Sequence, residues 1–168
     1  DRLLAIELVK RVSKAVQIPV TVKTRLGWDN KEENIEEFLL NLQDSGATMV
    51  TIHGRTRKEG FAGKADWKMI GRIKKLLEIP VIANGDIKNP KDALNCFNET
   101  NADGLMIGRG ILGSPWKIGE IDYAIKKQKG FREPNIEERL LLIIEHLDEL
   151  IKENGDHGLL IARKHISW

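Results

Sequence analysis

The sequence predicts a parallel α/β fold built from strand-plus-helix units. Four short apolar runs, rich in Val, Ile, Leu and Met, stop abruptly at polar residues or glycine, and residues at helical spacing separate them. Such runs are typical of parallel strands that are covered on both faces. The runs end at Lys23, His53, Asn84 and Gly108, which lie 30, 31 and 24 residues apart. This is the period of one strand and one helix, repeated four times.

The first two strands and the helices beside them follow from apolar spacing and proline. Apolar residues at helical spacing from Leu4 to Val16 predict a helix, which must end before Pro19 because proline disfavours helix in the residue before it. The runs 19–24 and 48–53 predict strands. The spacing from Ile35 to Leu42 predicts the helix between them.

The next two units carry helix-start signals. Asp66 is a plausible N-cap for the helix that precedes the third strand, 80–83. Asn89-Pro90 combines a cap with proline at the first helical position, and the strand 103–107 follows that helix. Ser114-Pro115 repeats the signal and predicts a helix through about residue 127.

Beyond Gly130 the pattern changes, because helices follow that no strand precedes. Asn135 and Glu138 resemble a capping box, and they open a long apolar-periodic segment. After a turn at 154–156, the segment from Leu159 to Trp168 starts another helix, which includes Arg163, Lys164 and His165.

Four units do not close a barrel, which needs about eight strands. We therefore expect either an open sheet or half of a barrel over residues 1–130, followed over 131–168 by the start of a helical domain. The chain opens without Met and closes on an apolar residue, so we expect it to be cut from something longer. Open sheet edges would favour self-association.

Composition excludes several classes of protein. The chain has 168 residues, of which 41% are hydrophobic and 31% charged, and this composition is not that of a disordered protein. Its formal charge of +2 alone does not predict a nucleic-acid partner. No apolar run approaches the roughly 20 residues of a membrane helix. The single cysteine, Cys96, excludes an internal disulfide and a Cys-based zinc cluster, and we expect it to be a packing residue. We expect no metal, no membrane and a cytoplasmic location.

Gly108-Arg109-Gly110 is the most informative site in the sequence. Glycines let backbone N–H groups approach an anion, and a helix N-terminus behind them favours negative charge. Arg109 can add charge-assisted hydrogen bonds, so we expect a phosphate here. The alternative is a simple turn with a surface arginine.

Other strand ends carry polar residues in the same position relative to the sheet. Asn84-Gly85-Asp86 is either a turn selected for its left-handed geometry or a set of polar groups aimed at a ligand. Lys23 either meets an anion or reaches solvent at the end of its strand. His53 is followed by Arg55 and Arg57, which form either an anion-binding set or a solvated basic loop.

With these residues in view, the chain resembles the tRNA-dihydrouridine synthase family. The similarity spans nearly the whole chain, and five motifs occur in the family's order: VTVKTRLGWD, VTIHGRTR, EGFAGKADW, VIANGDI and GLMIGRGILGSPW. Arg163-Lys164-His165 with Trp168 also resembles the start of that family's C-terminal helical domain. The resemblance implies a partial (β/α)8 TIM barrel of about four C-terminal βα units, followed by the beginning of an α-helical domain.

The resemblance also implies a chemistry. Family members bind FMN and use NADPH to reduce uridine in tRNA to 5,6-dihydrouridine. By resemblance, His53 lies beside flavin and uracil and assists catalysis, and the residues that bind FMN are Lys23, His53, Asn84, Gly85, Asp86, Gly108 and Arg109. The residues that face tRNA are Arg25, Arg55, Arg57, Arg163 and Lys164.

One departure from the family concerns the proton donor. In the family this acid is a cysteine in an Asn-x-x-Cys-Pro type motif on a loop of the earlier barrel strands, and no such motif occurs here. We therefore expect negligible synthase activity from the 168 residues alone. The alternatives are another FMN-dependent barrel of the dihydroorotate dehydrogenase type, which HGRTR and the basic final helix argue against, and a non-catalytic phosphate- or RNA-binding module.

Overall fold

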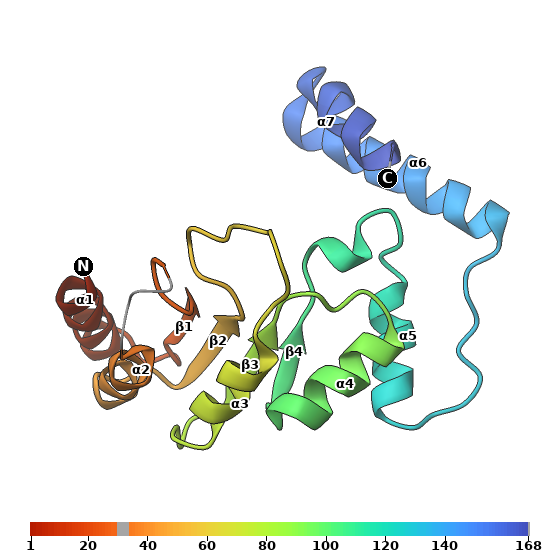
Figure 1. The fold of residues 1–168 in the computed structure, drawn as a ribbon. Helices are drawn as coiled ribbons and strands as arrows, with labels where there is room; N and C mark the ends of the chain where they lie inside the picture. Colours follow the sequence, from red (N-terminus) through yellow and green to blue (C-terminus); the bar gives the residue numbers. More distant parts are fainter. Residues whose placement is uncertain (30–33, 168) are drawn as a thin grey trace. The chain divides into compact units, whose positions relative to one another are not determined.

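The computed structural model describes residues 1–29 and 34–167, in which strands alternate with helices (Figure 1). The residues form two compact units, one of residues 1–87 and 91–108 and the other of 88–90 and 109 onward, and each is described by itself. Trp168, the last residue of the final predicted helix, lies outside the described residues.

The first unit contains one parallel sheet whose strands are paired in chain order. β1 (Thr21–Arg25) pairs with β2 (Met49–His53), β2 with β3 (Val81–Asn84), and β3 with β4 (Gly104–Met106). Doubly wound open sheets reverse direction at a switch point, whereas barrel strands follow one another in sequence. The order β1-β2-β3-β4 is therefore that of a partial barrel.

The helices cover one face of this sheet. Three right-handed crossovers that each advance one strand in the same direction leave their helices on the same side. α2 (Ile35–Asp44), α3 (Trp67–Lys74) and α4 (Pro90–Thr100) connect the strands, and α1 (Arg2–Ala15) precedes them. The side chains buried between helices and sheet are Leu39, Leu42, Ile70, Ile73, Ala93 and Cys96 from the helices and Val50, Ile52, Val81 and Ala83 from the strands.

Most of the expected helix boundaries are confirmed. Asp66 caps α3 by accepting a hydrogen bond from the backbone N–H of Met69 at 2.9 Å, and α4 begins at Pro90 as predicted. Cys96 is fully buried in α4, and burial raises the pKa of its thiol to about 12, so it is a packing residue.

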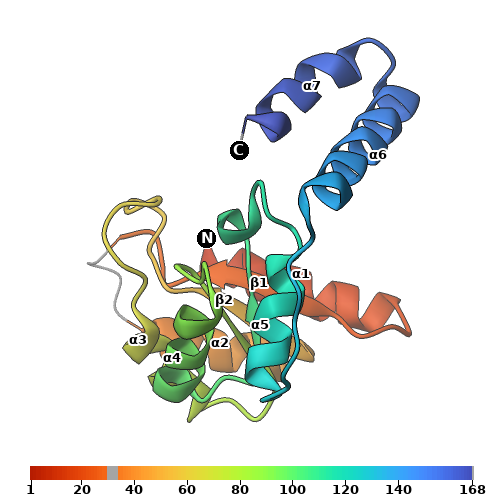
Figure 2. The same ribbon diagram turned by 90° about the vertical axis from the view of Figure 1, so that its right-hand side faces the viewer.

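The second unit is helical. It contains a short 3-10 helix, η1 (Arg109–Ile111), followed by α5 (Lys117–Ile125), α6 (Ile136–Asn154) and α7 (His157–Ile166). Asn135 and Glu138 form the expected capping box of α6. α6 and α7 lie side by side, with the rings of His146 and His165 5.0 Å apart (Figure 2). Among the described residues, no helix combines the length and apolarity needed to cross a membrane.

One expectation for this unit differs from the structure. Ser114-Pro115 does not open α5, which begins at Lys117 without a side-chain cap; Ser114 lies in the preceding turn. Arg139 of α6 lies over the ring of Trp116, the residue before α5, at 4.7 Å.

Close contact between α3 and α4 generates a prediction about stability. A Cβ on Gly71 of α3 would lie 2.8 Å from the carbonyl oxygen of Glu99 in α4, and this backbone atom cannot move aside easily. Figures 1 and 2 show these two helices side by side. We expect Gly71→Ala to lower the free energy of unfolding, because overpacking by about 1–3 kcal/mol outweighs the gain of about 1 kcal/mol in helix propensity.

Urea unfolding measures this effect. Lys68→Ala, at an exposed position of the same helix, is the control and should change the free energy of unfolding by less than about 0.5 kcal/mol. An unchanged or higher stability of Gly71→Ala would contradict the close helix contact.

Candidate functional site

Strand register brings the strand-end residues onto one face of the sheet. Arg25 pairs with His53 and His53 with Asn84, and Lys23 precedes Arg25 by two residues. Because side chains alternate along a strand, Lys23, His53 and Asn84 all belong to the face opposite the helices. Lys23 is exposed and Asn84 half-buried. The sequence predicted these three residues as site residues, and they share a face of the sheet: His53 and Asn84 end their strands, and Lys23 lies two residues before the end of β1.

His53 is held as a neutral imidazole. Burial lowers the pKa of His53 to about 4, assisted by the positive charges of Arg25, Lys23 and Arg55 and opposed by Asp86. Its Nε2 lies 3.4 Å from Nη1 of Arg55. Arginine can only donate, so Nε2 accepts and the ring proton resides on Nδ1. His53 is therefore a neutral hydrogen-bonding group rather than a proton source at neutral pH.

Arg55 is the central structural residue of the site, which the sequence did not predict. Its side chain is 2% exposed. Nη2 donates to Asp86 Oδ1 and Oδ2 at 2.8 and 2.7 Å and to the carbonyl of Gly63 at 2.8 Å, while Nε donates to the carbonyl of Ala62 at 2.8 Å. The expectation that Arg55 faces RNA is corrected: its guanidinium is directed into the protein and holds the loop after β2.

Asp86 and Gly85 complete this arrangement at the end of β3. Asp86 Oδ2 also accepts a hydrogen bond from the backbone N–H of Ala65 at 2.7 Å, so its carboxylate binds protein donors, contrary to the expectation that Asp86 faces a phosphate. Gly85 has φ +120°, and a Cβ there would lie 2.9 Å from Cδ2 of His53. Only glycine lets this turn approach the imidazole so closely.

Arg25 supports the same loop from β1. Its Nη1 donates to the carbonyls of Thr56 at 2.8 Å and Gly60 at 2.9 Å, and its guanidinium lies 5.6 Å from the ring centroid of Phe61. Phe61 is 58% exposed, and its ring centroid lies 6.3 Å from that of His53. Sequence reasoning missed Phe61. The sequence feature that could have identified Phe61 is an aromatic residue within a polar, glycine-bearing loop.

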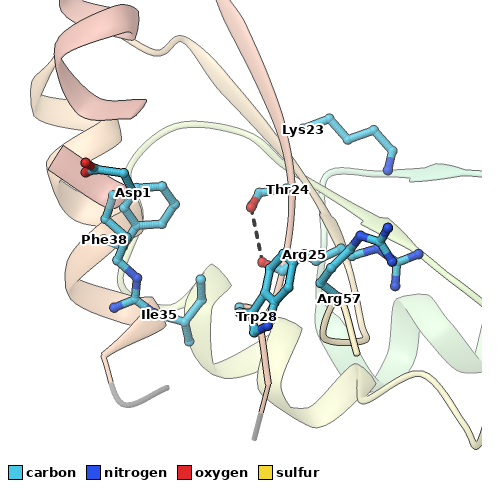
Figure 3. Close-up of a pocket in the computed structure, with 10 residues that line it drawn as sticks. Asp1, Lys23, Thr24, Arg25, Trp28, Ile35, Phe38 and Arg57 are labelled. Atoms are coloured by element: carbon cyan, nitrogen blue, oxygen red, sulfur yellow. Dashed lines mark hydrogen bonds between the residues drawn. The ribbon is translucent and has the colours of Figure 1, made fainter. Parts of the chain in front are cut away.

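A hollow of about 420 Å³ lies beside β1. Figure 3 shows the side chains that line it, among them Lys23, Arg25, Trp28 and Arg57. Asn84 is not one of the lining residues. The hollow therefore shares Lys23 with the strand-end residues and extends toward the loops that follow β1 and β2.

The remaining predicted residues belong to the β4 end or to the second unit. Gly108 ends the first unit, and the space that a Cβ would occupy there has no atom within 4 Å. Arg109 begins the second unit, in a 3-10 helix of three residues rather than an α-helix. Arg163 and Lys164 are exposed in the last turn of α7.

Comparison with known proteins gives a consistent result. The family profile described as Dihydrouridine synthase (Dus) matches residues 1–168. The probable tRNA-dihydrouridine synthase 1 of Synechocystis is 50% identical over 161 residues, covering 96% of this chain and 45% of the relative. The probable tRNA-dihydrouridine synthase of Rickettsia typhi is 45% identical over 169 residues, covering 100% and 52%.

Further matches agree on coverage. The tRNA-dihydrouridine synthase B of Pasteurella multocida is 40% identical, covering 96% of this chain and 49% of the relative. The chain thus spans about half the length of the curated relatives it matches. Among solved structures, a mandelate oxidase variant aligns with 70% of this chain and 48% of its own at 18% identity and a TM-score of 0.49, a level at which we draw no conclusion.

The Arg55–Asp86 pair generates a prediction about folding. Removing the carboxylate leaves a buried guanidinium without its anion, which is strongly destabilising. Because the Asp86 side chain is 28% exposed, we expect Asp86→Ala to lower the free energy of unfolding by about 2–4 kcal/mol. Lys58→Ala, which breaks the exposed pair with Asp29, should cost at most about 1 kcal/mol in the same urea titration. Equal effects would show that the pair is not a buried anchor.

The lowered pKa of His53 generates a prediction about pH. Between about 4 and 6.5 the unfolded chain binds a proton that folded His53 does not, so this contribution to stability is present above about 6.5 and is lost as pH falls toward 4. NMR titration of the ring C–H signals should give an apparent pKa near 4, assigned by its loss in His53→Gln. The same variant should flatten the pH dependence of stability in this window. A midpoint near 6.5 would contradict the buried, neutral ring.

Proposed function

Because the chain belongs to the dihydrouridine synthase family, we propose that it forms the flavin-binding part of a cytoplasmic, FMN-dependent enzyme that reduces uridine to 5,6-dihydrouridine in tRNA with NADPH. The chain spans about half the length of its relatives, so this is the activity of the whole protein. The observation that supports it best is the shared sheet face of Lys23, His53 and Asn84.

The groups on this face suit a flavin ring. Neighbouring strands lie about 4.8 Å apart, so this face spans about 10 Å from β1 to β3, wide enough for a fused-ring group, and Lys23 lies two residues before the level of His53 and Asn84. Lys23 provides a positive charge, and neutral His53 provides one N–H. Asn84 donates its amide to the carbonyl of Met106 at 2.7 Å, which leaves its oxygen as an acceptor. When bound, FMN would supply the hydride chemistry, and these residues would orient it.

The phosphate of FMN requires backbone donors and positive charge. We propose Gly108 and the backbone of Gly85 as the backbone donors, and Arg109, the residue that follows Gly108 in the chain, stays the predicted source of positive charge. The open space beside Gly108 Cα supports it, because an anion can approach the bare backbone there. Asp86 is better explained as the anchor of Arg55 than as a phosphate ligand.

The proposed contacts with tRNA are fewer than the sequence suggested. Arg57 is exposed in the loop after β2, and Arg163 and Lys164 are exposed on α7, in the segment from residue 131 that we propose as the start of the tRNA-binding domain. Arg25 and the exposed ring of Phe61 would together offer a stacking surface for a base turned out of its helix. Arg55 is withdrawn from this set.

The proton that completes the reduction needs a donor elsewhere. The single cysteine, Cys96, is buried in α4, and its pKa of about 12 describes a thiol shielded from solvent, so it does not serve as that acid. Membership of the family also weighs against the dihydroorotate dehydrogenase alternative. The free edges that β1 and β4 have among the described strands support the expectation that the chain alone self-associates.

Flavin binding tests the proposal directly. FMN added to the purified chain should show quenched fluorescence, and Lys23→Ala should weaken this binding by about 10- to 150-fold, as expected for loss of one charge-assisted contact. Lys68→Ala removes the same charge from an exposed position of α3 and should leave the affinity unchanged. Absence of FMN binding by the unmodified chain would favour a non-catalytic phosphate- or RNA-binding module.

A further inference from the structure

The loops that follow β1 and β2 are joined by backbone hydrogen bonds. Leu26 N–H donates to the carbonyl of Arg55 at 3.1 Å, Arg57 N–H to Gly27 at 2.9 Å, and Lys58 N–H to Trp28 at 2.9 Å. These bonds continue the association of the two strands beyond their ends. They fix Trp28 and Arg57 on adjacent backbone segments at the hollow beside β1 (Figure 3).

Trp28 gives this hollow an aromatic surface. Its side chain is 59% exposed, and the lining also includes the apolar side chains of Ile35 and Phe38. An indole that meets water over more than half of its area, next to further apolar groups, is a stacking surface for a planar ring.

The charge of the hollow is positive. Its lining contains Arg2, Lys23, Arg25 and Arg57, against the single carboxylate of Asp1. Within residues 1–29 and 34–167, no hydrogen bond or ion pair joins the side chain of Lys23 or of Arg57 to a protein acceptor. Aromatic surface beside uncompensated cations is the combination that binds single-stranded nucleic acid through stacking and phosphate contacts.

We propose that this hollow binds a nucleotide of single-stranded RNA next to the base that reacts, with Trp28 stacking on its ring and Arg57 contacting its phosphate. The proposal rests on the proposed function and adds a second subsite to it. Lys23 lines both regions, so the subsite is continuous with the strand-end face. The alternative ligand is an acidic segment of a protein, which the positive charge of the hollow would bind without any stacking on Trp28.

Binding of labelled RNA tests this subsite. Fluorescence anisotropy would follow an unmodified tRNA transcript and an oligouridylate of about 10 nucleotides, at about 50 to 200 mM potassium chloride. We expect Trp28→Ala to weaken binding by about 5- to 150-fold without changing the salt dependence, because stacking releases no counterions. Arg57→Gln should weaken binding and reduce the slope of log affinity against log salt by about one.

Matched variants separate stacking from packing and from charge. Trp28→Tyr keeps a ring and should retain most of the affinity, whereas Trp28→Leu keeps apolar bulk and should not. Arg72→Gln, on α3 and paired with Glu36, removes the same charge outside the hollow and should leave the salt slope unchanged. Circular dichroism would verify that each variant is folded, which the exposure of Trp28 leads us to expect.

The outcomes discriminate between the two proposals. If the unmodified chain binds neither RNA, both fail. If it binds tRNA and the Trp28 variants bind equally well, or Trp28→Leu binds as the unmodified chain does, the subsite is wrong and the proposed function stands. Polyglutamate is an anionic polymer without bases that could stack. If it displaces labelled oligouridylate as well as unlabelled oligouridylate does, the subsite is also overturned.

Discussion

The ion pair between Arg55 and Asp86 is the interaction on which the candidate site depends. A buried guanidinium is tolerated only when its donors are paired. Here its partners lie in two separate segments, the loop after β2 and the turn after β3, and the guanidinium joins them. The same guanidinium fixes the protonated nitrogen of His53 through its contact with Nε2. One side chain thus contacts the loop after β2, the turn after β3 and the imidazole ring.

Helix caps and the spacing of apolar residues predicted most of the fold, because these signals depend only on residues that are close in sequence. Asp66, Pro90 and the pair Asn135 and Glu138 start their helices where expected. Ser114 satisfied the same rule and failed, since a turn at Ser114-Pro115-Trp116 delays α5 to Lys117. Periodicity left two alternatives for the sheet, because it is the same in an open sheet and in a barrel, and the family resemblance predicted the partial barrel that the strand order confirms.

The site was predicted less completely than the fold. His53 and Asn84 end their strands as predicted, whereas β1 continues two residues past Lys23, and the strand register places all three side chains on one face. Arg55 was assigned to the surface because arginine in a polar loop is normally exposed, and its burial depends on Asp86, 31 residues later in the chain. Phe61 was missed for a related reason: only the three-dimensional course of its loop brings it to His53.

The two arginines that support the loop after β2 also determine how its peptide groups are oriented. Arg25 and Arg55 together engage the carbonyl oxygens of Thr56, Gly60, Ala62 and Gly63. In a trans peptide the C=O and N–H bonds are antiparallel, so each carbonyl drawn toward a guanidinium turns the following N–H the opposite way. The two guanidinium groups thereby fix the orientation of four peptide groups of this loop, and the N–H of Arg57, which follows the Thr56 carbonyl, is turned toward the carbonyl of Gly27 in the loop after β1.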